Sequence, residues 1–221
     1  MRQRFWQAIL GIGLLVGVSG SALADFVYTL DTNNIAIPGP IGTATVHLID
    51  STHASVTFLA NNPTFNYWFS DGGAVAVNVN AATWIATATG NCASCSPLAN
   101  GGAGNEDGFG SFKQTFNAGS GAPGDRSTSI TVLLTNTSGT WASDMVVLIG
   151  NAGGFSVAAH VFVCPQGVNG TCSVTGFATN GSGGVEQQGR VPEPGMLGLL
   201  AIGLLASGVT VVRRRARSAG G

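Results

Sequence analysis

Short stretches in which apolar and polar residues alternate recur along the middle of the chain. Val75, Val77 and Val79 alternate with small or polar residues, as do Ile130, Val132 and Leu134. A period of two places one set of side chains on one face of a strand. Similar short runs rich in Val, Ile, Thr and aromatic residues occupy residues 43–50, 54–60, 65–69, 74–80, 83–88, 111–116, 129–136, 145–149 and 155–164.

Turn-forming sequences separate these runs, and no stretch between residues 25 and 195 has the 3.6-residue apolar period of a long helix. Many short strands joined by tight turns are typical of antiparallel sandwiches. The pattern therefore predicts an all-β fold, an antiparallel β-sandwich of jelly-roll-like form, over residues 25–179. Residues 180–190, rich in Gly, Ser and Gln, are predicted to be a flexible linker. The turns fall at residues 61–63, 71–73, 100–104, 119–124, 138–139 and 151–154.

The N-terminus has the three-part pattern of a secretory signal peptide. Arg2 and Arg4 precede a short apolar run, and the small residues that follow end in Ala22-Leu23-Ala24. This layout predicts a signal peptide over residues 1–24, with Ala22 and Ala24 at the cleavage site. The apolar run is too short to span a bilayer comfortably. The mature chain is therefore expected to begin at Asp25 and to lie outside the inner membrane.

A second apolar run, residues 196–212, is followed at once by Arg213, Arg214, Arg215 and Arg217. As a helix it would be about 26 Å long, slightly short of a hydrocarbon core of about 30 Å. Arginines stay on the cytoplasmic side, so a transmembrane helix here would leave the preceding domain outside. Directly before it stands Val-Pro-Glu-Pro-Gly at residues 191–195, which the two prolines hold extended.

The order of these features in residues 191–221 resembles the PEP-CTERM family. Pro192, Glu193, Pro194 and Gly195 come first, then the short helix, then the arginine cluster at 213–217. The resemblance implies a Gram-negative-type bacterium and recognition of the tail by an exosortase-type membrane protease. That protease would release the protein, or transfer it to the cell surface or its exopolysaccharide matrix. An ordinary single-pass anchor behind a proline-rich linker would show the same helix and arginines.

Charge bears on the class of partner. Between residues 25 and 195, only Lys113, Arg126 and Arg190 are basic, against all ten acidic residues of the chain, which gives this region a net charge of −7. Such a surface repels phosphate backbones, so nucleic acid is not an expected partner. Charged residues are sparse, whereas Gly, Ser, Thr and Asn are abundant, a composition that suits strands and turns.

Four cysteines are expected to be oxidised in an exported chain. Local pairing, Cys92 with Cys95 and Cys164 with Cys172, is favoured over the two crossed pairings because an Asn-Gly turn separates the latter pair. A redox-active Cys-x-x-Cys would need a helix after its first cysteine, which Ser96-Pro97 does not offer. A four-cysteine zinc site is disfavoured by the second spacing.

Other candidate sites lack a complete chemical pattern. His47 and His53 flank a predicted hairpin turn and His160 lies in an apolar run, but no catalytic or metal-binding motif accompanies them. Residues 119–124 match GxGxxG, yet a strand follows, so no helix start is there to hold a pyrophosphate. Glu106 and Asp107 form a weak calcium candidate without the spacing of a calcium loop.

The sequence thus predicts an exported surface or extracellular-matrix protein with a non-enzymatic adhesive or structural domain and no cofactor. Two alternatives stay open. One is a carbohydrate-binding module or extracellular hydrolase, in which Trp68, Trp84 or Trp141 would stack on sugar rings. The other is an ice- or mineral-binding surface built on threonine rows such as Thr87 and Thr89, or Thr135 and Thr137.

Overall fold

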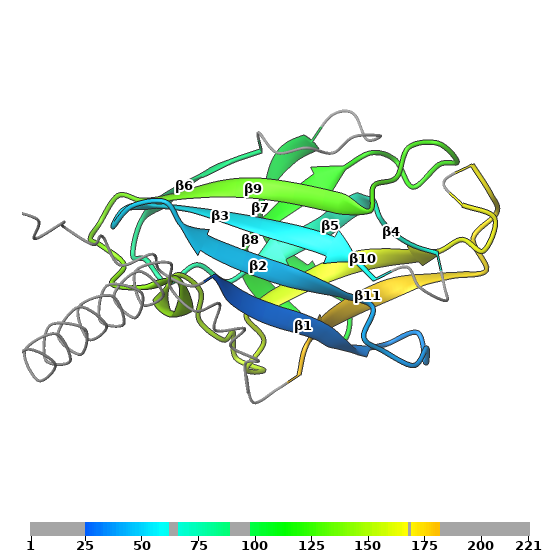
Figure 1. Cartoon of the computed structure of the whole chain (residues 1–221), viewed down its shortest axis with the longest axis horizontal. Helices are drawn as coiled ribbons and strands as arrows, with labels where there is room; N and C mark the ends of the chain where they lie inside the picture. Colours follow the sequence, from blue (N-terminus) through cyan, green and yellow to red (C-terminus); the bar gives the residue numbers. More distant parts are fainter. Residues whose placement is uncertain (1–24, 62–65, 89–97, 168, 182–221) are drawn as a thin grey trace, which may run out of the picture. The chain divides into compact units, whose positions relative to one another are not determined.

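The computed structural model describes residues 25–61, 66–88, 98–167 and 169–181, all within one compact unit (Figure 1). This part of the chain contains eleven strands and one 3-10 helix, so the predicted all-β class is confirmed. The elements are β1 (Phe26–Asn33), β2 (Gly42–Leu48), β3 (His53–Ala60), β4 (Tyr67–Phe69), β5 (Asp71–Val77), β6 (Trp84–Thr87), β7 (Leu98–Glu106), β8 (Gly110–Ala118), β9 (Ser129–Asn136), η1 (Asp144–Val146), β10 (Val157–Val163) and β11 (Val174–Asn180).

All the strand pairs are antiparallel and belong to one hydrogen-bonded sheet. Its order is β6-β9-β3-β2-β1-β11-β10-β5-β8-β7, and β4 pairs with β10 beside this path. The first and last strands of the domain, β1 and β11, pair in the middle of the sheet. The predicted division into two separate sheets, as in a jelly roll, is not confirmed, because this order runs without a break.

The sheet folds back so that its two halves enclose one core. Figure 1 shows β7 and β8 behind β2 and β3. Side chains also link the two ends of the strand order: the Trp84 Nε1–H donates to Gln114 Oε1 (3.3 Å), and Asn100 Nδ2–H donates to the Ala86 carbonyl (3.2 Å). The largest core cluster draws on both halves, including Val56, Phe58, Val75, Phe116, Ile130 and Val161, each 0% exposed.

Alternation explains the inward faces of the first half. In β3, Ala54, Val56 and Phe58 are fully buried, whereas the residues between them are partly exposed. Burying each large apolar side chain is worth roughly 1.5–3 kcal/mol, so a one-residue slip of register would cost most of the core of this half.

The strand prediction was wrong in several details. β1 and β11 lie outside all of the predicted runs, and residues 71–73, predicted to be a turn, begin β5. Residues 100–104, predicted to be a turn, lie inside β7, where backbone pairing with β8 replaces a side-chain pattern. Residues 145–149, predicted to be a strand, begin in η1, and only Leu148 makes an isolated bridge, to Val79. The last strand, β11, reaches Asn180, whose Oδ1 accepts hydrogen bonds from the Ser156 and Val157 N–H groups.

Candidate functional site

The outward side chains of β1, β2, β3, β9 and β6 form a broad surface dominated by Thr and Ser. Their registers place Thr45 beside Thr57 and Thr57 beside Thr131, with Val27 at the end of the same row. We call this surface the hydroxyl face. Its members are Val27, Thr29, Thr43, Thr45, His47, His53, Ser55, Thr57, Leu59, Ile85, Thr87, Ser129, Thr131, Leu133 and Thr135.

The hydroxyl face holds no lysine, arginine, aspartate or glutamate. Its methyl and hydroxyl groups are partly exposed, and Leu59 (53% exposed) and Ile85 (58% exposed) add apolar area. Thr57 and Thr131 share a hydrogen bond between their Oγ1 atoms (2.9 Å). Such a surface offers neutral hydrogen-bond donors and acceptors beside small apolar patches, so it suits an uncharged, hydroxyl-rich partner.

Of the threonines named in the threonine-row hypothesis, Thr87 and Thr135 belong to the hydroxyl face. Thr137 follows β9 and donates a hydrogen bond to Thr83 Oγ1 (2.8 Å), while Thr89 lies outside the described residues. The rows that the fold creates run across strands, from β1 to β6, rather than along one strand. Sequence reasoning missed them because cross-strand neighbours are set by register.

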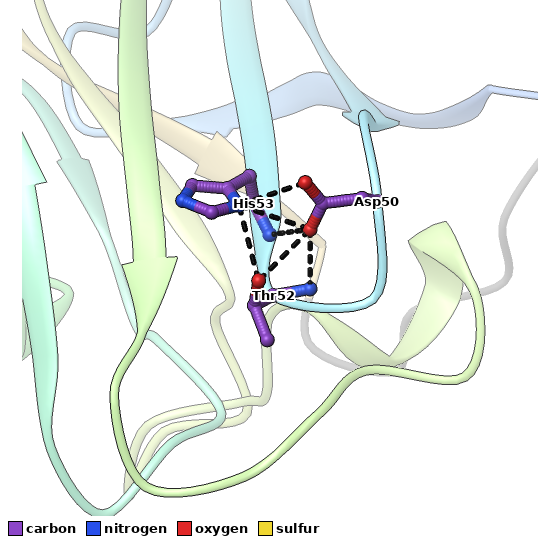
Figure 2. A network of polar contacts seen from close by, with 3 residues as sticks. All are labelled: Asp50, Thr52 and His53. Atoms are coloured by element: carbon purple, nitrogen blue, oxygen red, sulfur yellow. Dashed lines mark hydrogen bonds and ion pairs between the residues drawn. The ribbon is translucent and has the colours of Figure 1, made fainter.

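At one end of the hydroxyl face, the β2–β3 turn holds a compact polar network (Figure 2). The Asp50 carboxylate accepts from the Thr52 N–H (2.8 Å), the Thr52 hydroxyl (2.9 Å) and the His53 N–H (2.9 Å). It also lies 2.8 Å from His53 Nδ1. The hydrogen bond from the Thr52 N–H, followed by that from His53, holds the pKa of Asp50 far below its usual range. The carboxylate closes a tight turn of the kind that Asp favours.

This Asp–His–Thr set does not have the geometry of a catalytic triad. In a triad, the acid binds one imidazole nitrogen and the nucleophile binds the other. Here the Asp50 carboxylate and the Thr52 hydroxyl both contact His53 Nδ1, at 2.8 Å and 3.0 Å. The acid and the hydroxyl therefore share one imidazole nitrogen. The ring cannot accept a proton from the hydroxyl on one side while the acid orients it from the other.

The histidines do not form one cluster. His47 Nδ1 lies 2.7 Å from Asp25 Oδ1, whereas His53 binds Asp50. His160 lies in the other half of the sheet, where its ring stacks on Phe177 at 4.5 Å and meets Phe162 at 4.7 Å. Burial lowers the pKa of His160. Within the described ranges, no group of three or more His, Cys, Asp or Glu side chains gathers to hold a metal ion.

Glu106, the calcium candidate, ends β7 and is only 2% exposed, whereas Asp107 is exposed. The Glu106 carboxylate lies over Gly73, where an added Cβ would collide with both of its oxygens. Oε2 is buried and has no hydrogen-bond partner. Burial raises the pKa of Glu106 to about 7. The structure thus separates the two carboxylates and makes Glu106 a buried acid, which the sequence pattern alone did not reveal.

Cys164 and Cys172 form a disulfide, as predicted; Cys92 and Cys95 lie outside the described residues. The buried guanidinium of Arg126 supports this region. Its Nε–H donates to the Gly121 carbonyl (2.8 Å) and its Nη1–H to the Gly170 carbonyl (3.1 Å), while the group lies 5.4 Å from the Phe162 ring. The glycine-rich loop 119–124 therefore packs against Arg126, and burial lowers the pKa of this arginine.

The structure does not bring the three tryptophans together. Trp141 is 3% exposed and donates its Nε1–H to the Asn80 carbonyl (2.8 Å). Trp84 is half-buried in β6 beneath the Lys113 ammonium, 5.7 Å from the ring centroid. Trp68 lies in β4 opposite Phe162, and its Nε1 is buried without a partner. These positions give the tryptophans no shared surface on which a sugar chain would stack.

Comparison with known families bears on the C-terminal tail. Residues 190–215 match the family model of the PEP-CTERM protein-sorting motif. The tail is a PEP-CTERM sorting motif. The match covers the Pro-Glu-Pro segment, the predicted helix and the first three arginines, whereas Arg217 follows it. No curated protein and no solved structure is similar enough to the chain to count as a match.

The PEP-CTERM motif, the predicted signal peptide and residues 182–190 of the predicted linker lie outside the described residues, whereas Asn180, predicted to begin the linker, is the last residue of β11. A helix long and apolar enough to cross a membrane is not found in the described part of the chain. PEP-CTERM motifs are in general processed by exosortase, so the match indicates an exported protein that is sorted at a membrane. The motif says nothing about what the β domain binds.

Proposed function

We propose that the chain is held in the inner membrane by its tail and then delivered by an exosortase-type protease to the cell surface or the extracellular matrix. The observation that carries this proposal is the sorting motif at residues 190–215. The signal-peptide pattern of residues 1–24 agrees with it, because a cleaved signal peptide and a tail with cytoplasmic arginines would both leave the β domain outside the cytoplasm.

The sorting step is tested by replacing Pro192, Glu193 and Pro194 with alanine. A plain anchor needs only apolar length and arginines, so this change would leave membrane insertion intact. A protease instead needs an extended segment, which alanines convert to helix. The variant should accumulate as a longer, membrane-bound form, whereas the parent is shorter and lies outside the inner membrane.

A matched control places three alanines at Glu186, Gln187 and Gln188 in the predicted linker. Mass spectrometry of fractionated cells of the native host should find this control processed like the parent. If the parent and the Pro-Glu-Pro variant have the same mass and the same membrane fraction, the tail is a simple anchor and the proposal fails.

For the delivered domain, we propose a non-enzymatic adhesive or structural role in which the hydroxyl face binds uncharged polysaccharide of the matrix. Three features support this role. The only titratable members of the hydroxyl face are His47 and His53, although residues 25–195 carry a net charge of −7. Its cross-strand rows present hydroxyl and methyl groups together. The polar network at its end lacks the arrangement that nucleophilic catalysis needs.

This role is tested by co-sedimentation with cellulose, chitin and matrix isolated from the producing cells. A lysine at Thr57 would stand in the centre of the hydroxyl face and hold a hydrated charge there. The Thr57→Lys variant should bind at least about tenfold more weakly than the parent, a loss of about 1.4 kcal/mol. Ser111→Lys, at an exposed position of β8, is the control and should bind like the parent. Equal binding by both variants, or no binding by the parent, would exclude the hydroxyl face as the binding surface.

Ice or mineral binding is a second candidate that the same threonine rows favour. Neighbouring strands rotate by about 20–25° in an ordinary sheet, so a face five strands wide is not flat. A rigid crystal surface would therefore meet only part of it, whereas a flexible polysaccharide chain can follow the twist. Thermal hysteresis or mineral adsorption that Thr57→Lys abolishes, without any polysaccharide binding, would favour this candidate instead.

A further inference from the structure

Asp144, the first residue of η1, is a buried acid with an incomplete set of partners. Its side chain is only 2% exposed. Oδ1 accepts a hydrogen bond from the Leu48 N–H (2.9 Å), whereas Oδ2 is buried and has no partner. Burying a carboxylate oxygen without a hydrogen-bond partner costs free energy. The unpaired Oδ2 therefore points to a donor that binds it in the mature protein.

Strand register shows what the Asp144 carboxylate replaces. Phe26 pairs with Val46, so Asp25 stands opposite His47, and the residue before it would stand opposite Leu48. The Ile49 N–H donates to β3. Because backbone groups alternate sides along a strand, the Leu48 N–H points toward β1. The Asp144 carboxylate accepts this N–H where the carbonyl of residue 24 would stand in a longer β1.

If the register of β1 is continued by one residue, the backbone nitrogen of Asp25 is bonded to the carbonyl carbon at that position. It therefore lies at the edge of the site that Asp144 occupies. The titratable groups that face Asp144 are the Asp25 carboxylate and the His47 ring, which bind each other at 2.7 Å. Burial, and then the negative charge of Asp25, raise the pKa of Asp144, whereas the Leu48 hydrogen bond and His47 act in the opposite direction.

We propose that the α-ammonium group of Asp25, once freed by cleavage after Ala24, binds Asp144 Oδ2. Hydrolysis of the peptide bond between Ala24 and Asp25 consumes one water and leaves a carboxylate on Ala24 and an ammonium on Asp25. In the uncleaved chain the same nitrogen is a neutral amide. Removal of the signal peptide thus supplies the cation that this buried acid lacks, and ties the start of β1 to η1.

This pairing makes the mature fold sensitive to where the signal peptide is cut. A charged donor on a buried carboxylate forms a strong hydrogen bond, whereas an amine one residue farther away would miss the site. The inference rests on the predicted cleavage site and on described residues, and it is independent of the sorting proposal. Failure of C-terminal sorting would leave it unchanged.

The pKa of the α-amino group tests the proposal directly. Lys113 is the only lysine in the chain, so in a Lys113→Arg background the exported protein has one primary amine. Reductive methylation with ¹³C-formaldehyde keeps its charge and gives one NMR signal to titrate. With Asp144 present, its pKa should lie about one unit or more above the value in Asp144→Asn, because a carboxylate favours the charged amine.

Two controls separate other causes. Asp25→Asn removes the neighbouring carboxylate and should keep most of the difference, since Asp144 remains. A glycine inserted between Ala24 and Asp25 moves the amine away without altering the domain, and should lower the pKa as Asp144→Asn does. This variant also serves if Asp144→Asn fails to fold. Equal pKa values with and without Asp144, or with and without the glycine, would overturn the proposal, as would a mature N-terminus other than Asp25 by mass spectrometry.

Discussion

The two halves of the sheet share one core but differ in how far their outward-pointing side chains are buried. In β1, β2, β3 and β9, buried and partly exposed residues alternate, and the exposed set makes the hydroxyl face. In β5 and β10, residues that point outward are buried as well, as Ala76 and Ala158 show. There Phe109 and Phe112 join them in a second apolar cluster, against which Phe155 and Phe177 pack.

This difference indicates where the fold gains its stability and where it leaves side chains free for binding. Apolar area removed from water is worth roughly 25 cal/mol per Å², so the second cluster adds stability on the outer side of β5 and β10. The threonines of the hydroxyl face bury much less apolar area. Their identities are therefore less constrained by folding and can follow the needs of a partner.

The largest contrast is expected between Phe112→Ala and Leu133→Ala. Phe112 is 1% exposed in the second cluster, whereas Leu133 is 36% exposed on the hydroxyl face. Truncating a buried Phe typically costs about 3–5 kcal/mol because a cavity remains. Truncating Leu133 should cost less than about 1 kcal/mol. Urea unfolding followed by tryptophan fluorescence measures both.

Equal losses in these two variants would contradict the comparison, because they would mean that the outer faces contribute alike. Phe112→Leu is the milder control, since it removes less volume and should cost an intermediate amount. An unchanged denaturant slope would show that each variant still unfolds from the same native state.

A pH-dependent change in stability of intermediate size is expected at Glu106, the last residue of β7, in the half of the sheet that contains β5 and β10. Its folded pKa of about 7 exceeds the ordinary value of 4.5. Below pH 4.5 the group is protonated in both states and has no cost. As the pH rises from 4.5 to 7, the unfolded chain loses its proton first, so stability falls, by up to roughly 3 kcal/mol above pH 7.

Glu106→Gln cannot ionise, so it should gain stability over the parent progressively between pH 4.5 and 7. The measurement is the difference in unfolding free energy between variant and parent at several pH values, which cancels contributions shared with Asp144 and other acids. A difference for Glu106→Gln that does not vary with pH would mean that Glu106 is charged or neutral in both states alike.

Much of the fold could be predicted from alternation, and the failures have physical causes. Val75, Val77, Ile130, Val132 and Leu134 are all fully buried, as their period of two indicated. β7 could not be found in this way, because its Gly- and Asn-rich residues bind β8 through the backbone. The sheet order, with β1 beside β11, depends on contacts between distant parts of the chain, which local patterns do not encode.

The candidate sites also differ in whether a local pattern or contacts between distant residues define them. The tail was recognisable because its motif is contiguous, whereas the hydroxyl face requires the registers of five strands. The incomplete partner sets of Glu106 and Asp144 also depend on tertiary structure, since Gly73 and Leu48 are remote from them in sequence. The sequence is rich in Thr and Ser, but composition alone does not show that many of them lie on one face of the sheet.

The smallest effect on stability, and the sharpest test of the hydroxyl face, is expected for Thr57→Val. Valine has nearly the same shape and favours strands, and the lost Thr57–Thr131 hydrogen bond is partly exposed to water, so unfolding free energy should change by less than about 0.5–1 kcal/mol. Binding to cellulose, chitin or the cell-derived matrix should nevertheless weaken, because a central hydroxyl has gone. Thr57→Ser keeps the hydroxyl and should retain more binding than Thr57→Val, although it removes the methyl group. If Thr57→Val is strongly destabilised while binding per folded molecule is unchanged, the threonines stabilise the sheet, and the two halves do not differ in the way proposed.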